Sequence, residues 1–237
     1  MSDMLRTGAA AGAAIAVMCA FGVTPAGAAP PRTLAGTGFR VAERLGVTSV
    51  SPSRTYTVTF ASARLKKRYT PYLTGAVTQM RAAGVRIVLG GVERVDPARC
   101  PPWGHIQYTQ TYRPLGRGGY SKGLPCPHPA KGVASGGVVT MDSEYFDGTW
   151  HMAPHELRNT FVHEMLHTLG LDHPNLDLDG DGEAGRYECA TGPDGVKPVM
   201  CSPNGGYADA AGAGRLTPFE ERALRAMLAN ARGAGAD

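Results

Sequence analysis

Hydrophobic and polar residues first alternate regularly at residues 55–60, where threonines alternate with a tyrosine, a valine and a phenylalanine. A period of two residues is typical of a half-buried β-strand. Three further short runs rich in β-branched and aromatic residues, at residues 85–89, 105–112 and 137–141, predict additional strands. The pattern therefore predicts a sheet with four strands.

A helical period lies between the first two predicted strands. Its apolar positions have the i, i+3, i+4, i+7 spacing of an amphipathic helix and are Leu73, Ala76, Val77 and Met80. Thr70 suits the start of this helix with Pro71 in its first turn, and Gly84 suits its end. The strand–helix–strand order predicts a βαβ unit with parallel strands.

Two more helices are predicted in the C-terminal half. Pro154 suits the first turn of one, whose sheet-facing apolar residues are Leu157, Phe161, Leu166 and Leu169. Thr217, Pro218 and Glu220 form a capping box that begins the other. Its apolar stripe consists of Leu224, Met227 and Leu228. We therefore expect an α+β (mixed α/β) fold with a twisted, mostly parallel sheet.

The N-terminal segment has the features of an export signal. Residues 1–28 combine a basic residue, a short alanine-rich apolar run and a small-residue cleavage site. This run is too short for a transmembrane anchor, so we expect a secreted, extracellular protein with no membrane anchor after cleavage. We interpret residues 29–54 as a propeptide or N-terminal arm, residues 55–230 as one folded domain, and residues 231–237 as a flexible tail.

Four cysteines follow the predicted signal: Cys100, Cys126, Cys189 and Cys201. An even number in an exported chain favours two disulfides, for which three pairings exist. Proximity in sequence favours Cys100–Cys126 and Cys189–Cys201, and buried free thiols are the alternative.

The charge balance excludes one class of partner. Lysines and arginines number 24 and aspartates and glutamates 20, a formal net charge of +4. This small excess is not the concentrated basic patch of a nucleic-acid-binding protein. We therefore expect no nucleic-acid partner, and we interpret the protein as a monomer.

Residues 113–137 are rich in glycine and proline, which predicts a long irregular loop. His105 and His128 are isolated in sequence, and we interpret both as ordinary histidines. His151 and His155 are expected at the surface. The acidic residues Asp142 and Glu144 follow the last predicted strand. They could cap the strand end or bind calcium, and we favour a solvated turn.

The strongest chemical pattern consists of His163, Glu164, His167, Gly170 and His173. Residues four apart lie on one face of a helix, so the first two histidines can bind the same ion. Glycine can adopt the left-handed conformation that ends a helix and reverses the chain, which brings in the third histidine. Three imidazoles and an open fourth position are typical of a catalytic zinc site.

This pattern, followed by Met200, resembles the signature of the metzincin zinc metalloproteases. The resemblance implies a zincin-like catalytic domain over residues 55–230 and a non-ligating Met200 beneath the zinc. Pro174 is similar to serralysins, whereas the C-terminal helix is similar to matrixins. Ser202 stands where astacins and serralysins have a zinc-proximal tyrosine, which leaves Tyr207 as a distant candidate. The subfamily stays open.

The resemblance implies a zinc-dependent endopeptidase that acts on proteins or peptides. Zinc lowers the pKa of bound water to about 7, and Glu164 is placed to accept the proton as the general base. The alternative is an exported calcium- or zinc-binding module that keeps a metalloprotease-like fold without catalysis.

A second group of acidic residues fits the template of a calcium-binding loop. Its candidate ligands are Asp177, Asp179, Asp181 and Glu188. The helix that would precede such a loop in an EF-hand is absent from the pattern, because Pro174 stands in its place. Calcium is therefore weighed against an acidic, glycine-rich surface turn.

Overall fold

The computed structural model describes residues 38–128 and 131–234. Its main sheet consists of β2 (Ser49–Val50), β3 (Tyr56–Phe60), β4 (Ile87–Val92), β5 (His105–Thr111), β6 (Lys122–Pro127) and β7 (Val133–Asp142). The strand order is β2-β7-β5-β3-β4, and β6 pairs with β7. All of these pairings are parallel except that of β6 with β7. The predicted mixed α/β fold with a mostly parallel sheet is confirmed.

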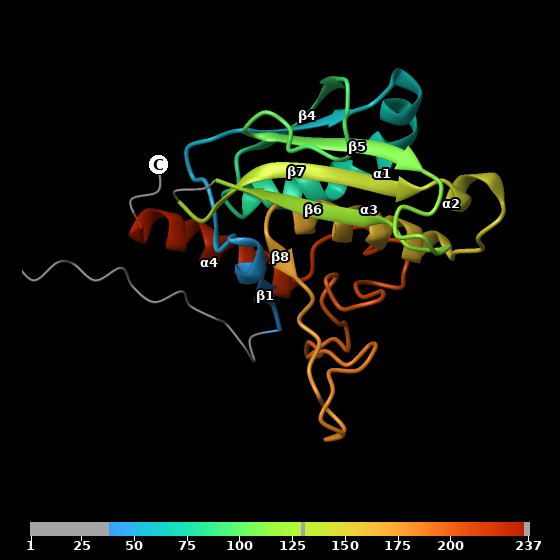
Figure 1. The fold of residues 1–237 in the computed structure, drawn as a ribbon. Coiled ribbons are helices and arrows are strands. Elements are labelled where there is room, and N and C mark those ends of the chain that lie inside the picture. Colours follow the sequence, from blue (N-terminus) through green and yellow to red (C-terminus); the bar gives the residue numbers. More distant parts are fainter. Residues whose placement is uncertain (1–37, 129–130, 235–237) are drawn as a thin grey trace, which may run out of the picture.

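The helices are α1 (Ala63–Ala82), α2 (Glu144–Asp147), α3 (Pro154–Thr168) and α4 (Pro218–Gly233), with a short 3₁₀ helix at Glu43–Leu45. Figure 1 shows α1, α3 and α4 on one side of the main sheet. In the described part of the chain, no helix is both long and apolar enough to span a membrane.

Aromatic packing fixes α3 against α1 and the sheet. The Phe161 ring stacks on Tyr72 with centroids 4.5 Å apart and meets the edge of Tyr69 at 4.7 Å. The Tyr108 hydroxyl of β5 donates a hydrogen bond of 2.8 Å to the Phe161 carbonyl. Such pairs add specific geometry to the burial of large apolar surfaces. These contacts therefore fix the position of α3 relative to the sheet and to α1.

The predicted start of α1 at Thr70 is wrong. The helix begins at Ala63, because the Ser62 side chain caps it by accepting a hydrogen bond from the Leu65 amide at 3.2 Å. Pro71 consequently lies inside the helix. The apolar stripe also continues toward the N-terminus through buried residues Leu65 and Tyr69. The predicted βαβ unit is confirmed, since β3 and β4 precede and follow α1 in the chain and pair in parallel.

The interpretation of residues 113–137 as one irregular loop is also wrong. Strand β6 lies within it, and β7 begins at Val133 rather than at residue 137. Two of the glycines that suggested a loop, Gly123 and Gly137, are instead required by close contact between the sheet and α3. A Cβ atom at Gly137 would overlap the Leu124 carbonyl oxygen and lie 2.9 Å from the Thr168 Cβ.

The folded domain begins before residue 55. Strand β1 (Arg40–Val41) pairs with β8 (Leu171–Asp172), and Val47 and Val50 are completely buried. Helix α4 continues to Gly233, so residues 231–233 are helical and not a frayed tail. The predicted signal at residues 1–28, the segment 29–37 and the last three residues lie outside the described residues.

Both predicted disulfides are confirmed. Cys100 is bonded to Cys126 of β6, and Cys189 is bonded to Cys201. Disulfides persist in oxidising compartments, so the two bonds are consistent with an extracellular protein.

Candidate metal centre

Three imidazoles converge at the C-terminal end of α3. His163 and His167 lie one turn apart on this helix, which ends as predicted before Gly170 at φ +92°. The chain then reverses through β8 and brings in His173. The three Nε2 atoms lie 3.0 Å (His163 to His173), 3.1 Å (His163 to His167) and 3.1 Å (His167 to His173) apart.

Gly170 is required at this turn for two reasons. Its positive φ is rarely adopted by residues with a side chain. A Cβ atom here would also overlap the Val47 side chain of the N-terminal segment. The sequence therefore brings His173 back to α3 only with glycine at this position.

The other nitrogens of two of these rings define their tautomers. The Nδ1 atom of His163 lies 2.9 Å from the Val199 carbonyl oxygen, and that of His167 lies 2.8 Å from the Leu171 carbonyl oxygen. A carbonyl oxygen only accepts hydrogen bonds, so each Nδ1 carries the proton and each Nε2 presents a lone pair. The lone pairs of His163 and His167 therefore face the centre of the group.

The three imidazole rings are neutral and not protonated. Burial lowers the pKa of His163 well below its ordinary value, and the neighbouring imidazoles lower it further. Burial likewise lowers the pKa of His167 to about 3 and lowers that of His173. A cation that accepts the lone pairs of these nitrogens would stabilise such a group of neutral rings.

The nitrogen triangle fits a divalent metal ion. Tetrahedral zinc binds imidazole nitrogens at about 2.0–2.1 Å, which separates two ligands by about 3.3–3.4 Å. The observed separations of 3.0–3.1 Å are only slightly shorter. His163, His167 and His173 can thus hold a metal with a fourth position left open, and neutral imidazole suits several transition metals.

Glu164 lies beside the histidines and is only 7% exposed. Burial raises the pKa of its carboxyl group to about 8, and a hydrogen bond from the Gly123 backbone opposes this shift. A Cβ atom at Gly123 would overlap the Glu164 carbonyl oxygen. Strand β6 therefore passes directly against the segment of α3 that carries the carboxylate.

The segment around Met200 supports the His163 ring through a backbone hydrogen bond. Val199 and Met200 are buried, and the Cys201 amide donates to the Pro198 carbonyl at 3.0 Å to close a turn. The Val199 carbonyl oxygen in this turn accepts from His163, as described above. Met200 thus lies in the turn whose Val199 carbonyl accepts from His163, and the adjacent Cys201 is bonded to Cys189. Its place beneath a bound zinc stays a prediction.

Glu220 is a supporting residue that the sequence interpretation recognised only as part of a capping box. It is completely buried, and its carboxylate accepts from the Thr217 amide at 3.0 Å and the Thr217 hydroxyl at 2.5 Å. It also accepts from the Met200 amide at 3.3 Å. That amide belongs to the same peptide group as the Val199 carbonyl. Glu220 thus reaches His163 through a single peptide unit.

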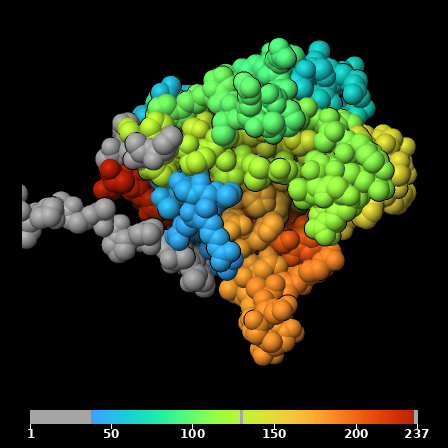
Figure 2. All heavy atoms as spheres, in the orientation of Figure 1, coloured from blue at the N-terminus to red at the C-terminus, as the bar shows by residue number. Residues whose placement is uncertain are grey.

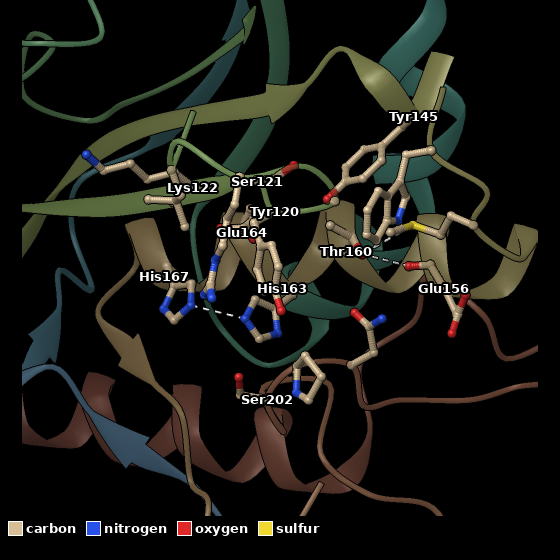
Figure 3. Close-up of a pocket in the computed structure, with 18 of the residues that line it drawn as sticks. Tyr120, Ser121, Lys122, Tyr145, Glu156, Thr160, His163, Glu164, His167 and Ser202 are labelled. Atoms are coloured by element: carbon tan, nitrogen blue, oxygen red, sulfur yellow. Dashed lines mark hydrogen bonds between the residues drawn. The ribbon is translucent and has the colours of Figure 1, made fainter. Parts of the chain in front are cut away.

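The three histidines and Glu164 open into a cleft of about 510 Å³. Figure 3 shows His163, His167 and Glu164 together in this cleft, with Tyr120 and Ser121 nearby. Residues 120–124 line it from the β6 side, and residues 186–187 and 202–204 line it as well. Three tyrosines contribute to the lining, at positions 120, 145 and 187, none of which the sequence interpretation singled out.

One wall of the cleft is held by two buried acids. Asp142 accepts hydrogen bonds from the amides of Arg113 at 3.2 Å, Gly119 at 3.0 Å and Glu144 at 3.2 Å. The Arg113 guanidinium forms two bonds with the Glu144 carboxylate, at 3.0 and 3.1 Å. Both acids are 0% exposed, so the predicted solvated turn is wrong. They fasten residues 113–121 to the end of β7.

The remaining predicted residues are distributed as follows. His105 pairs with Glu93 at 2.8 Å, and His128 stacks on Trp103, so neither approaches the three-histidine group. Exposed His151 lines the cleft, as does Ser202. Tyr207 does not contribute to the lining.

The acidic loop is only partly assembled as predicted. Carboxylate oxygens of Asp177, Asp179 and Asp181 lie within 4.8 Å of one another on an exposed loop that protrudes from the domain (Figure 2). Their side chains accept hydrogen bonds from amides of the same loop. Glu188 is instead bonded to the Gly185 amide at 2.5 Å. The predicted calcium ligand set is therefore reduced to three exposed aspartates.

No family model matches the chain, and no curated protein matches it by sequence. The fold and the site themselves define a mixed α/β domain with a buried three-histidine group, and a buried carboxylate beside it, at the base of a cleft.

Proposed function

We propose that this protein is an exported zinc endopeptidase of the metzincin type. One observation carries the proposal: the Nε2 atoms of His163, His167 and His173 lie within 3.0–3.1 Å of one another, with Glu164 in the same cleft. Three neutral imidazoles leave the full charge of a dication available for chemistry. The two disulfides support export.

The residues supply the parts that peptide hydrolysis requires. Zinc held here would polarise the substrate carbonyl and lower the pKa of a coordinated water to about 7. Glu164 is the general base, because it is the carboxylate that shares the cleft floor with the histidines. Its buried setting raises its proton affinity, so it can take a proton from water and transfer it to the leaving amine.

The cleft also offers a place for an extended polypeptide. Strand β6 pairs with β7 along one edge, and residues 121–124 line the cleft. An extended peptide can add to such an edge through backbone hydrogen bonds, which are independent of side-chain identity. This arrangement favours a polypeptide substrate over a small molecule.

The alternative of a non-catalytic metal-binding module is less well supported. A buried carboxyl group costs free energy unless it is paired, and within residues 38–128 and 131–234 the hydrogen bond to the Glu164 carboxylate comes from the Gly123 backbone. A structural zinc site is normally closed by a fourth protein ligand. In the described residues no fourth histidine, cysteine or carboxylate joins the group.

The test compares casein hydrolysis by the wild type and by Glu164→Gln, each loaded with one equivalent of zinc. We expect the variant to bind zinc and to lose at least about 10²-fold in rate, because a positioned general base contributes about that much. Glu221→Gln, on the exposed side of α4, is the matched control and retains activity. Equal rates for Glu164→Gln and the wild type would refute the proposed role, and absence of hydrolysis by zinc-loaded wild type would refute the function.

A further inference from the structure

The charged side chains that line the cleft are predominantly cationic. Arg117, Lys122 and Arg186 line it together with two carboxylates, Glu156 and Glu164. Glu164 is buried at the catalytic floor, and Glu156 uses one carboxylate oxygen to accept from the Ala153 amide at 3.0 Å. The accessible part of the cleft therefore has an excess of positive charge.

None of these three cations has an acidic partner within ion-pair distance in the described part of the chain. The Arg117 guanidinium lies 3.8 Å from the centroid of the Tyr120 ring, and that of Arg186 lies 5.9 Å from the centroid of Tyr187. Contact with a ring face leaves the in-plane N–H donors of a guanidinium free to bind a carboxylate. The positive charges are consequently available to a ligand.

The three cations come from two segments of the chain, residues 113–124 and the loop that carries Arg186. Arg117 lies in the segment 113–121, Lys122 begins β6, and Arg186 lies in the loop before Cys189. In Figure 3 the Lys122 side chain extends from β6 away from His167. A chain bound in the cleft would therefore meet positive charge at several points of the lining, and not at a single one.

The wall that carries Arg117 is held in place before a ligand binds. Asp142 and Glu144 fasten residues 113–121 through the buried hydrogen bonds and the ion pair described above. A cation on a fixed wall loses little conformational freedom on binding, so more of its attraction contributes to affinity.

Exposed apolar side chains line the same cleft. Leu115, Leu124, Trp150 and Tyr187 line the cleft and are 42–47% exposed. They favour a partner with apolar as well as charged side chains, which describes a polypeptide better than a highly charged polymer. This arrangement decides between a polypeptide and a nucleic acid as the anionic partner.

We infer that the cleft selects polypeptides with acidic side chains close to the cleaved bond. The inference rests on the proposed endopeptidase function and adds its substrate class. Each exposed ion pair is worth about 0.2–1 kcal/mol, or up to about fivefold in binding. A substrate that engages two of the three cations should therefore be preferred by about 2- to 30-fold over its uncharged counterpart.

The experiment uses two peptides that differ only by Glu or Gln at the positions flanking the cleaved bond, with the zinc-loaded protein at 50 and 300 mM salt. We expect kcat/KM to favour the Glu peptide by about 2- to 30-fold at low salt and by less at high salt. The triple variant Arg117→Gln/Lys122→Gln/Arg186→Gln should reduce the preference below twofold. The control Arg64→Gln/Lys66→Gln/Lys67→Gln removes the same charge from exposed positions of α1 and should keep it.

Two results would overturn the inference while leaving the endopeptidase function intact. One is equal cleavage of both peptides, and the other is a preference that the α1 control lowers as much as the cleft variant does. Cleavage of neither peptide would count against the proposed function instead. In that case, fluorescence anisotropy with the zinc-loaded Glu164→Gln variant decides the inference, since tighter binding of the Glu peptide supports it and equal binding refutes it.

Discussion

Replacing Glu220 with alanine tests how the three-histidine group is supported without changing any of the histidines. This carboxylate lies on α4, is 0% exposed, and accepts from the amides of Thr217 and Met200 and from the Thr217 hydroxyl. Its removal leaves two buried amides without their acceptor, and each such group costs about 1–3 kcal/mol. We expect Glu220→Ala to lower the free energy of unfolding by about 2–5 kcal/mol.

The same substitution should weaken metal binding. The Met200 amide and the Val199 carbonyl share one peptide group, and that carbonyl accepts from His163 at 2.9 Å. Glu220 therefore both positions this peptide group and increases the negative charge on its oxygen. Loss of a partner that orients a metal ligand typically costs about 10–100-fold in affinity. We expect a zinc dissociation constant at least about tenfold larger.

The assay combines urea unfolding of the metal-free protein with competition for zinc by a chelator of known affinity. Glu221→Ala is the matched control, because its neighbouring carboxylate forms only a surface pair with Arg225 at 3.2 Å. That control should change stability by less than about 1 kcal/mol. Unchanged zinc affinity in Glu220→Ala, with its fold intact, would refute the link from α4 to His163.

Two further substitutions test the cleft floor. Gly123→Ala should lower activity at least about tenfold and stability by about 1–3 kcal/mol, because the new Cβ overlaps the Glu164 carbonyl oxygen and moves β6. Gly91→Ala is the control, since a Cβ there meets nothing within 4 Å, and equal activities of the two variants would contradict the contact. Burial raises the pKa of Glu164 from 4.5 to about 8, so the metal-free fold loses stability as the pH rises through this range. Glu164→Gln removes this loss, and its advantage in unfolding free energy over the wild type should grow by at least about 1 kcal/mol between pH 4.5 and 8, whereas a pH-independent difference would contradict the assignment.

The convergence of the three histidines could be predicted because it depends on residues that are close together in the sequence. His163 and His167 are fixed by the helical period, and Gly170 marks the reversal that brings in His173. Both disulfide pairings were also predicted, since each joins cysteines close in sequence. These features depend on short stretches whose geometry the chain specifies directly.

The features that the sequence did not predict depend on contacts between distant segments. Strand β6 looked like a loop, because its glycine at position 123 is explained only by the approach of α3. Asp142 and Glu144 looked solvated, because their partners in residues 113–119 become neighbours only after folding. The predicted start of α1 is too late because Pro71, a common first-turn residue, lies inside a helix that begins after the Ser62 cap.

Zinc K-edge X-ray absorption of the protein loaded with one equivalent of zinc tests the metal centre most directly. The geometry predicts three nitrogen ligands and one oxygen ligand at about 2.0–2.1 Å. It also predicts that His173→Ala reduces the nitrogen shell to two. A sulfur-containing shell, or a wild-type spectrum with fewer than three nitrogen ligands, would contradict the account.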